Sequence, residues 1–249
     1  TLAVEYRGHD DMIRCMSCDN LGQYLITGSD DQTIKIWEVM TARCLITIFM
    51  GDIVRAVSWC PNTALSLVAV AAGNNLFLIN PGVGDKLIVN KTDLLLEESP
   101  NQDIILSERV RTTVQWKNFS STDLEFLQKR IRIQLSHFKA VTQVVWHGKG
   151  DYFATVMPDG QSRSVVVNQL SRRRSQLPFS RSKGLVQCVA WHPVRPFLFV
   201  ATQRNIRIYD LVQQTIVKKL LSNSKWISSM SVHPGGDNLL VGTYDRKVL

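Results

Sequence analysis

Short runs in which apolar and polar residues alternate recur along the whole chain, and clusters of Gly, Asn, Asp, Pro and Ser separate them. Examples are IKIWE, RIRIQL and IRIYDL. Alternation with a period of two places every second side chain on one face, which is typical of a half-buried β-strand. Many short strands separated by turn residues predict an all-β chain of antiparallel hairpins.

The segment from Gly8 to Glu38 resembles one complete WD repeat. A Gly-His pair opens it, two short strand-like runs follow, Gly-Ser-Asp-Asp makes a turn, and Ile-Lys-Ile-Trp-Glu closes it. In a propeller blade such residues form a buried chain of hydrogen bonds, in which the polar groups satisfy one another and hold the loop to the sheet. The matching residues here are His9, Thr27, Asp31 and Trp37, with Ser29 as the weaker alternative to Thr27.

A catalytic interpretation of the same segment is a His-Asp pair with Ser29 or Thr27 as the nucleophile. Nothing in this stretch indicates a pocket or a pair of oxyanion donors, which acyl transfer needs. The structural interpretation of the four residues is therefore favoured, and no catalytic residue is assigned.

The alternating pattern repeats at an interval of about 40 to 45 residues. One apolar column of first strands contains Met16, Val57, Val144, Val189 and Met230, with steps of 41, 87, 45 and 41 residues. Four strands at this period are the signature of a WD-repeat β-propeller. The expected blades are residues 8–49, 51–135, 137–180, 184–221 and an incomplete 225–249, with Leu2 to Tyr6, within residues 1–7, as a latch strand and Ser136-His137 as a loop.

The step of 87 residues contains one blade and an insertion over residues 84–128. This stretch is polar and irregular, so we expect it to be partly ordered and partly flexible, with a short helix starting in Ser121 to Glu125. A surface loop that docks a partner, or one that merely tolerates sequence drift, is favoured over a lid on a catalytic pocket. The last unit stops before its Trp position, so about four and a half blades are expected in an open or truncated ring.

Composition and cysteines exclude several classes of protein. The chain has 249 residues, is 45% apolar, and has no apolar run long enough to cross a membrane. Its five cysteines are an odd number, which suggests reduced intracellular thiols. Cys15 and Cys18 form a C-x2-C, but in a predicted strand and without a second pair. His147, His192 and His233 share one repeat position and are expected in turns, so neither metal nor cofactor is predicted.

A net charge of +8 and a pI near 9.4 suit a polyanionic partner such as RNA. Five cations fall within thirteen residues between the third and fourth blades: Arg172, Arg173, Arg174, Arg181 and Lys183. Guanidinium groups pair bidentately with phosphate, and Phe179 offers a ring for stacking on a base. The segment is therefore the RNA-contact candidate, while a solvated basic loop is the alternative.

Arg14 and Arg55 occupy one repeat position near the start of a first strand, where later blades have Thr142, Gln187 and Ser228. This position lies near one mouth of a propeller ring. Two arginines there suit an acidic partner surface, because Arg is enriched at interface hot spots. Exposed strand-end arginines without a partner are the alternative.

Longer strings are similar to the C-terminal propeller of the block-of-proliferation ribosome-biogenesis proteins. They include VTQVVWHGKGDYFATV, QLSRRRSQLPFSRSKG, HPVRPFLFVATQRNIRIYDL and KKLLSNSKWISSMSVHPGGDN. The resemblance implies seven blades and a long N-terminal region in the full protein. It also implies a non-enzymatic scaffold of the nucleolus and nucleoplasm that supports large-subunit pre-rRNA processing.

The partners implied by the resemblance are a Pescadillo-type protein, contacted through the absent N-terminal region, a second WD-repeat protein, and pre-rRNA within the pre-ribosomal particle. Two other classes remain as alternatives. One is an enzyme that uses the central pocket of the ring, which would need clustered acids or metal-binding histidines at one mouth. The other is an adaptor or substrate receptor in signalling or ubiquitination, which would use a peptide-binding rim.

Overall fold

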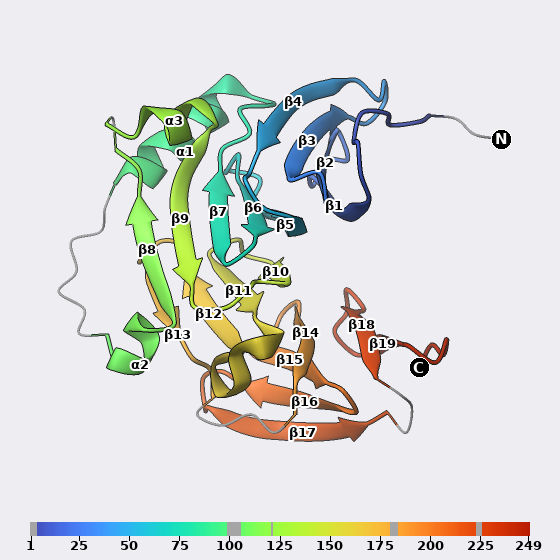
Figure 1. Ribbon diagram of the computed structural model, residues 1–249. Coiled ribbons are helices and arrows are strands. Elements are labelled where there is room, and N and C mark those ends of the chain that lie inside the picture. Colours follow the sequence, from blue (N-terminus) through green and yellow to red (C-terminus); the bar gives the residue numbers. More distant parts are fainter. Residues whose placement is uncertain (1–3, 99–105, 121, 180–183, 223–225) are drawn as a thin grey trace. The chain divides into compact units, whose positions relative to one another are not determined.

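The computed structural model describes residues 4–98, 106–120, 122–179, 184–222 and 226–249. The chain forms two compact units, and each is described by itself. The first unit is Thr1–Val144 with Ser171–Arg173, and the second is Val145–Leu170 with Arg174–Leu249. Antiparallel sheets make up most of both units (Figure 1). The all-β class of a WD-repeat propeller, expected from the alternating pattern, is confirmed.

The first sheet holds four antiparallel strands in chain order, joined by short turns. They are β1 (Ile13–Cys18), β2 (Tyr24–Ser29), β3 (Thr33–Glu38) and β4 (Cys44–Phe49). The fourth strand has the bounds that alternation predicts. Cys15 and Cys18 lie in β1, as expected, and all five cysteines are free thiols.

The second sheet has five strands in the order β5-β6-β7-β9-β8. They are β5 (Val54–Trp59), β6 (Val68–Ala72), β7 (Asn75–Ile79), β8 (Val114–Asn118) and β9 (Ile131–His137). The stretch predicted as irregular contributes β8, which pairs with β9 from Val114 opposite His137 to Asn118 opposite Ile133. His137 is thus the buried last residue of a strand, which corrects its assignment to a loop.

The described part of the insertion also contains three helices: α1 (Lys86–Glu97), α2 (Glu108–Arg111) and α3 (Leu124–Gln128). The short helix predicted near Ser121 is α3, which begins after Asp123. Polar contacts fix helix α1 to β9 and to the connection between β5 and β6: Arg132 Nε of β9 donates to Asp93 Oδ1 at 2.7 Å, and the Ser66 amide donates to Thr92 Oγ1 at 2.9 Å. The described part of the insertion therefore carries regular structure docked on its own blade.

Two more four-stranded sheets and one pair of strands follow in the described residues. The third sheet is β10 (Gln143–Trp146), which crosses the boundary between the units, β11 (Tyr152–Val156), β12 (Val165–Gln169) and β13 (Arg174–Gln176), with the 3-10 helix η1 (Pro158–Arg163) between β11 and β12. The fourth is β14 (Val186–Trp191), β15 (Phe197–Thr202), β16 (Asn205–Asp210) and β17 (Thr215–Leu221), and the pair is β18 (Ile227–Val232) and β19 (Leu239–Thr243).

Apolar side chains are buried between successive sheets. In the first unit, Ile26 and Ile36 of the first sheet belong to one buried cluster with Val57 and Val70 of the second. In the second unit, one cluster joins the third and fourth sheets and another joins the fourth sheet to β18 and β19. Because burial of one such side chain contributes about 1.5 to 3 kcal/mol, these faces hold neighbouring sheets together.

The predicted apolar column lies in the first strand of every sheet, which confirms the repeat. Met16, Val57, Val189 and Met230 pair with Thr27, Val70, Val200 and Val241, and Val144 lies in β10. Burial differs along the column: Val57 is 7% exposed, whereas Met16 is 72% exposed.

The latch strand expected at Leu2 to Tyr6 is not found in the described residues. Residues 1–3 lie outside them, and residues 4–7 are in no strand. Instead, Tyr6 donates a hydrogen bond from its hydroxyl to the Val39 carbonyl at 2.8 Å, and its ring meets Trp37 edge-on at 5.7 Å. These contacts attach the segment to the first sheet through a side chain rather than through strand pairing.

Candidate functional site

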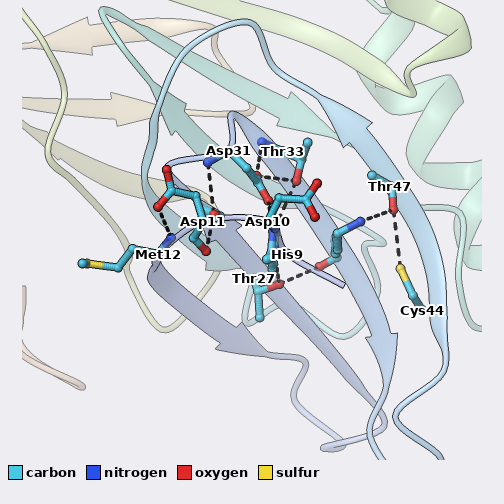
Figure 2. Close-up of polar contacts among 12 residues, drawn as sticks. His9, Asp10, Asp11, Met12, Thr27, Asp31, Thr33, Cys44 and Thr47 are labelled. Carbon is cyan, nitrogen blue, oxygen red and sulfur yellow. Dashed lines mark hydrogen bonds and ion pairs between the residues drawn. The ribbon is translucent and has the colours of Figure 1, made fainter. Parts of the chain in front are cut away.

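One continuous chain of hydrogen bonds joins the four polar residues of the first repeat, and Figure 2 shows its loop end. His9 Nδ1 lies 2.7 Å from Asp31 Oδ2, and His9 Nε2 lies 2.7 Å from Thr27 Oγ1. Trp37 Nε1 donates to the same hydroxyl at 2.8 Å. A fifth residue, Thr33, donates to Asp31 Oδ1 at 2.6 Å. The loop before β1 is thereby held to β2 and β3.

The chemistry of this network is structural. Burial alone would raise the pKa of Asp31, but the hydrogen bonds from Thr33, His9 and backbone amides outweigh it, so the pKa lies below its ordinary range and the carboxylate stays charged. The Thr27 hydroxyl is buried and already bonded to two rings. Ser29 donates to the Asp11 carbonyl at 3.1 Å and makes no bond to His9. Neither hydroxyl is thus poised as a nucleophile.

The third sheet has a buried polar network that alternation does not reveal. Ser175 donates its hydroxyl proton to Asn168 Oδ1 at 2.6 Å, and Asn168 Nδ2 lies 3.5 Å from Thr155 Oγ1. All three side chains are buried. Asn168 faces Phe153 across the strands as Trp37 faces Leu25 in the first sheet, so Asn takes the Trp position. In the sequence, the signal for this network was the presence of these three polar residues on buried strands.

A β-bulge marks the same place in four first strands. The register shifts lie between Ile13 and Cys15, Val54 and Ala56, Val186 and Cys188, and Ile227 and Ser229. The bulged residues are therefore Arg14, Arg55, Gln187 and Ser228, which belong to the column that the sequence singled out. A bulge adds one residue to one strand and redirects its side chain, often beside a functional site.

Arg14 and Arg55 line one hollow of about 320 Å³ together with Asp30, Ile53 and Thr142. Arg14 Nε donates to Asp30 Oδ1 at 2.8 Å, and this pairing raises the pKa of Arg14 and lowers that of Asp30. Arg55 is exposed and, within the described residues, makes no hydrogen bond. Two guanidinium groups facing one carboxylate leave a net positive charge, which favours an anionic group in this hollow.

The arginine cluster lies in a hairpin of the third sheet rather than between blades, which corrects the predicted placement. Arg172 is exposed in the turn, Arg173 has a positive φ of 47°, and Arg174 begins β13 opposite Gln169. The arginines thus lie at the turn between β12 and β13, which pair with each other, and this turn precedes the fourth sheet. The other two predicted cations, Arg181 and Lys183, lie outside the described residues.

The hairpin arginines differ in what they contact. Arg173 Nη2 donates to the carbonyls of Leu95 and Leu96, at 3.2 and 3.4 Å, at the C-terminal end of α1. A cation there satisfies helix carbonyls and favours the helix dipole. Phe179, expected to stack on a base, instead stacks on Tyr209 at 4.7 Å and packs against the core. Of this segment, Arg172 has the exposed position that an RNA contact needs.

The repeated histidines are turn residues, as predicted. The amides of Lys149, Val194 and Gly235 donate to the Nδ1 atoms of His147, His192 and His233, at 3.3, 3.1 and 3.0 Å. Within the described residues no group of three potential metal ligands comes together. Among the helices described, none has the length and apolar character needed to span a membrane.

The chain is similar to a known protein family and to several known proteins. Residues 1–38, 174–210 and 214–249 match the family described as WD domain, G-beta repeat. Three stretches of the chain are thus similar to WD repeats. A "Ribosome biogenesis protein BOP1 homolog" of Drosophila mojavensis is 62% identical over 247 residues, which cover 99% of this chain and 31% of that protein. Proteins of the same name from Drosophila grimshawi and Drosophila melanogaster are each 60% identical over the same shares.

These relatives confirm the resemblance to the block-of-proliferation proteins that the long sequence strings indicate. The chain spans 31% of the length of the curated relatives it matches, so their activity as whole proteins does not carry over to it directly.

Proposed function

We propose that this chain is a non-enzymatic scaffold in ribosome biogenesis, which supports processing and assembly of the large-subunit pre-rRNA by binding protein partners and pre-rRNA. The identity of 60 to 62% over 99% of the chain with proteins named for ribosome biogenesis carries the proposal. The net charge of +8 supports a polyanionic partner.

The proposed partners are a Pescadillo-type protein, bound by sequence outside these 249 residues, a second WD-repeat protein, and the pre-ribosomal particle of the large subunit. The proposed location is the nucleolus and nucleoplasm. A scaffold role without chemistry is supported by the use of His9, Asp31 and Thr27 in holding the first sheet together, which leaves none of them available to a substrate.

The proposed RNA contact consists of the hairpin residues Arg172 and Arg174 together with Arg181 and Lys183, which follow in the sequence. We expect Arg172→Glu to weaken binding of a pre-rRNA fragment about threefold and to lower the slope of log affinity against log salt by about 1, because the loss of a phosphate contact releases one counterion fewer. Fluorescence anisotropy at several salt concentrations measures both quantities.

Arg173 is left unchanged in that experiment because it contacts the end of α1. The matched control is Arg43→Glu, which changes the net charge equally at another exposed position. If the hairpin variant and the control bind RNA with the same affinity and salt slope as the unchanged chain, the hairpin is not an RNA contact.

The hollow lined by Arg14 and Arg55 is the proposed contact for an acidic surface of the second WD-repeat protein. Arg55→Glu should reduce recovery of that protein in a pull-down about fivefold, since it places a carboxylate beside Asp30 in the hollow. Arg55 is the better probe than Arg14, because Arg14→Glu would also break the pair with Asp30.

The control for the pull-down is Arg43→Glu, which reverses the charge of an exposed residue directly before β4. Equal recovery with Arg55→Glu and with the control would exclude Arg55 from the interface.

A further inference from the structure

Two cavities of this chain occupy equivalent places in two pairs of neighbouring sheets. The first gap, of about 250 Å³, lies between the first and second sheets and is lined by Tyr24 and Trp59 among others. The second gap, of about 450 Å³, lies between the third and fourth sheets and is lined by Tyr152 and Trp191. Each gap belongs to a single unit of the chain.

The hydrogen bonds of the turns establish that the two gaps correspond. In the first sheet, Asp19 N donates to Tyr24 O at 3.0 Å; in the third, His147 N donates to Tyr152 O at 2.8 Å. Trp59 and Trp191 are the last residues of β5 and β14, which start the next sheet in each case. Five lining positions match: Asp19 with His147, Leu21 with Lys149, Gln23 with Asp151, Tyr24 with Tyr152, and Trp59 with Trp191.

The first gap is covered in part by the start of the insertion. Val83, Gly84, Asp85 and Ile88 all line it. Gly84 has a φ of +87°, and a Cβ built on it would lie 3.9 Å from the Tyr24 ring, so the chain passes directly over this aromatic side chain. Asp85 then caps α1 by accepting from the Leu87 amide at 2.8 Å. The structure therefore holds an example of what this kind of gap accepts.

The second gap has no such cover from the described residues. After β16 the chain turns over residues 211–214 directly into β17, at the place where β7 is followed by the insertion. The lining is mostly apolar and includes Leu177, Pro178, Pro196 and Leu211, and Val212 at the cavity is 76% exposed. A larger cavity with aromatic and aliphatic walls and a few polar groups is typical of a binding site.

Charge distinguishes the two gaps. The position of Leu21 in the first gap is taken by Lys149 in the second. Asp151 also lines the second gap, and its carboxylate accepts a hydrogen bond from Gln169 Nε2 of the same sheet at 3.0 Å. The occupant of the second gap should consequently present a carboxylate to Lys149 in addition to apolar side chains.

We propose that the second gap docks a short segment of a partner protein that enters as residues 83–88 enter the first gap: two aliphatic side chains around a glycine, at the start of a helix, with an acidic residue for Lys149. This site goes beyond the proposed RNA and acidic-surface contacts, and it uses neither Arg55 nor Arg172. An aromatic-lined hollow filled by aliphatic anchors is a common mode of peptide recognition.

The test uses a fluorescein-labelled peptide that copies residues 81–93, in which Asp85 is the acidic residue that lines the first gap. The peptide is titrated with the 249-residue chain and followed by anisotropy. We expect saturable binding that becomes about tenfold weaker with Val212→Asp, which places a charge at the apolar rim, and with Lys149→Glu, which repels the peptide carboxylates. Val194→Asp is the control, because Val194 is 79% exposed in the same unit and does not line the gap.

A charge exchange sharpens the test: the peptide with Asp85→Lys should bind the Lys149→Glu variant better than it binds the unchanged chain. Several results would overturn the proposal. The first two are absence of binding to the unchanged chain and equal binding by all variants. Binding that occurs only after residues 180–183 are replaced by Gly and Ser would assign the gap to the chain itself. A dimer of the chain that Val212→Asp dissociates would assign the gap to a second copy.

Discussion

Thr27→Val should lower the free energy of unfolding by about 3 kcal/mol. Valine has nearly the shape of threonine, so the packing of β2 is preserved while one hydroxyl is lost. That hydroxyl lies 2.7 Å from His9 Nε2 and 2.8 Å from Trp37 Nε1, and the Trp37 side chain is buried. Each buried group left without its partner costs about 1 to 3 kcal/mol. Urea denaturation followed by circular dichroism measures the change.

Thr47→Val in β4 is the matched control for that measurement. Its hydroxyl accepts from Lys35 Nζ at 3.1 Å on an exposed surface, where loss of a hydrogen bond changes stability by about 0.5 kcal/mol or less. If the two variants unfold at the same urea concentration, the network of the first sheet does not stabilise the fold.

Acidification from pH 7 to pH 4 should remove about 3 kcal/mol of stability through His137. Burial lowers the pKa of this histidine to about 4 from an ordinary value of 6.5. Above pH 6.5 the ring is neutral in both the folded and the unfolded chain, so it has no effect. Between pH 6.5 and 4 only the unfolded chain takes up the proton, and the free energy of unfolding falls by about 1.4 kcal/mol per pH unit.

His137→Gln should flatten this part of the stability curve, because glutamine has no proton to take up in this range. His233→Gln is the control, since His233 lies in an exposed turn. Chemical denaturation at pH 7, 6, 5 and 4 gives the slope for each variant. A slope with His137→Gln as steep as that of the unchanged chain would assign the acid sensitivity to other groups.

Strand positions were predictable because alternation and turn residues are local signals. The bounds of β4, the place of Cys15 in β1, and the apolar column all follow from a period of two and a repeat length. The arginine column was also visible, but the bulges at Arg14 and Arg55 were not, because a bulge depends on the register of the neighbouring strand.

The errors share a physical cause, which is that long-range packing decides between local alternatives. Val114 to Asn118 alternates weakly, yet it is a strand because β9 offers it an open edge. His137 has the polar character of a loop residue but is buried at the end of a strand. Phe179 follows a basic segment, yet Tyr209 of the next sheet takes up its ring. None of these partners lies close in sequence.

The insertion also has a consequence for the order in which the chain folds. In the first sheet five residues separate β3 from β4, whereas 51 residues separate β7 from β9 in the second. Closing the longer loop costs about 2 kcal/mol more in chain entropy, from the logarithmic dependence on loop length. The hairpins of the first, third and fourth sheets can therefore form early from neighbouring segments. The outer half of the second sheet is expected to join late, and a nascent chain would expose the β7 edge in the meantime.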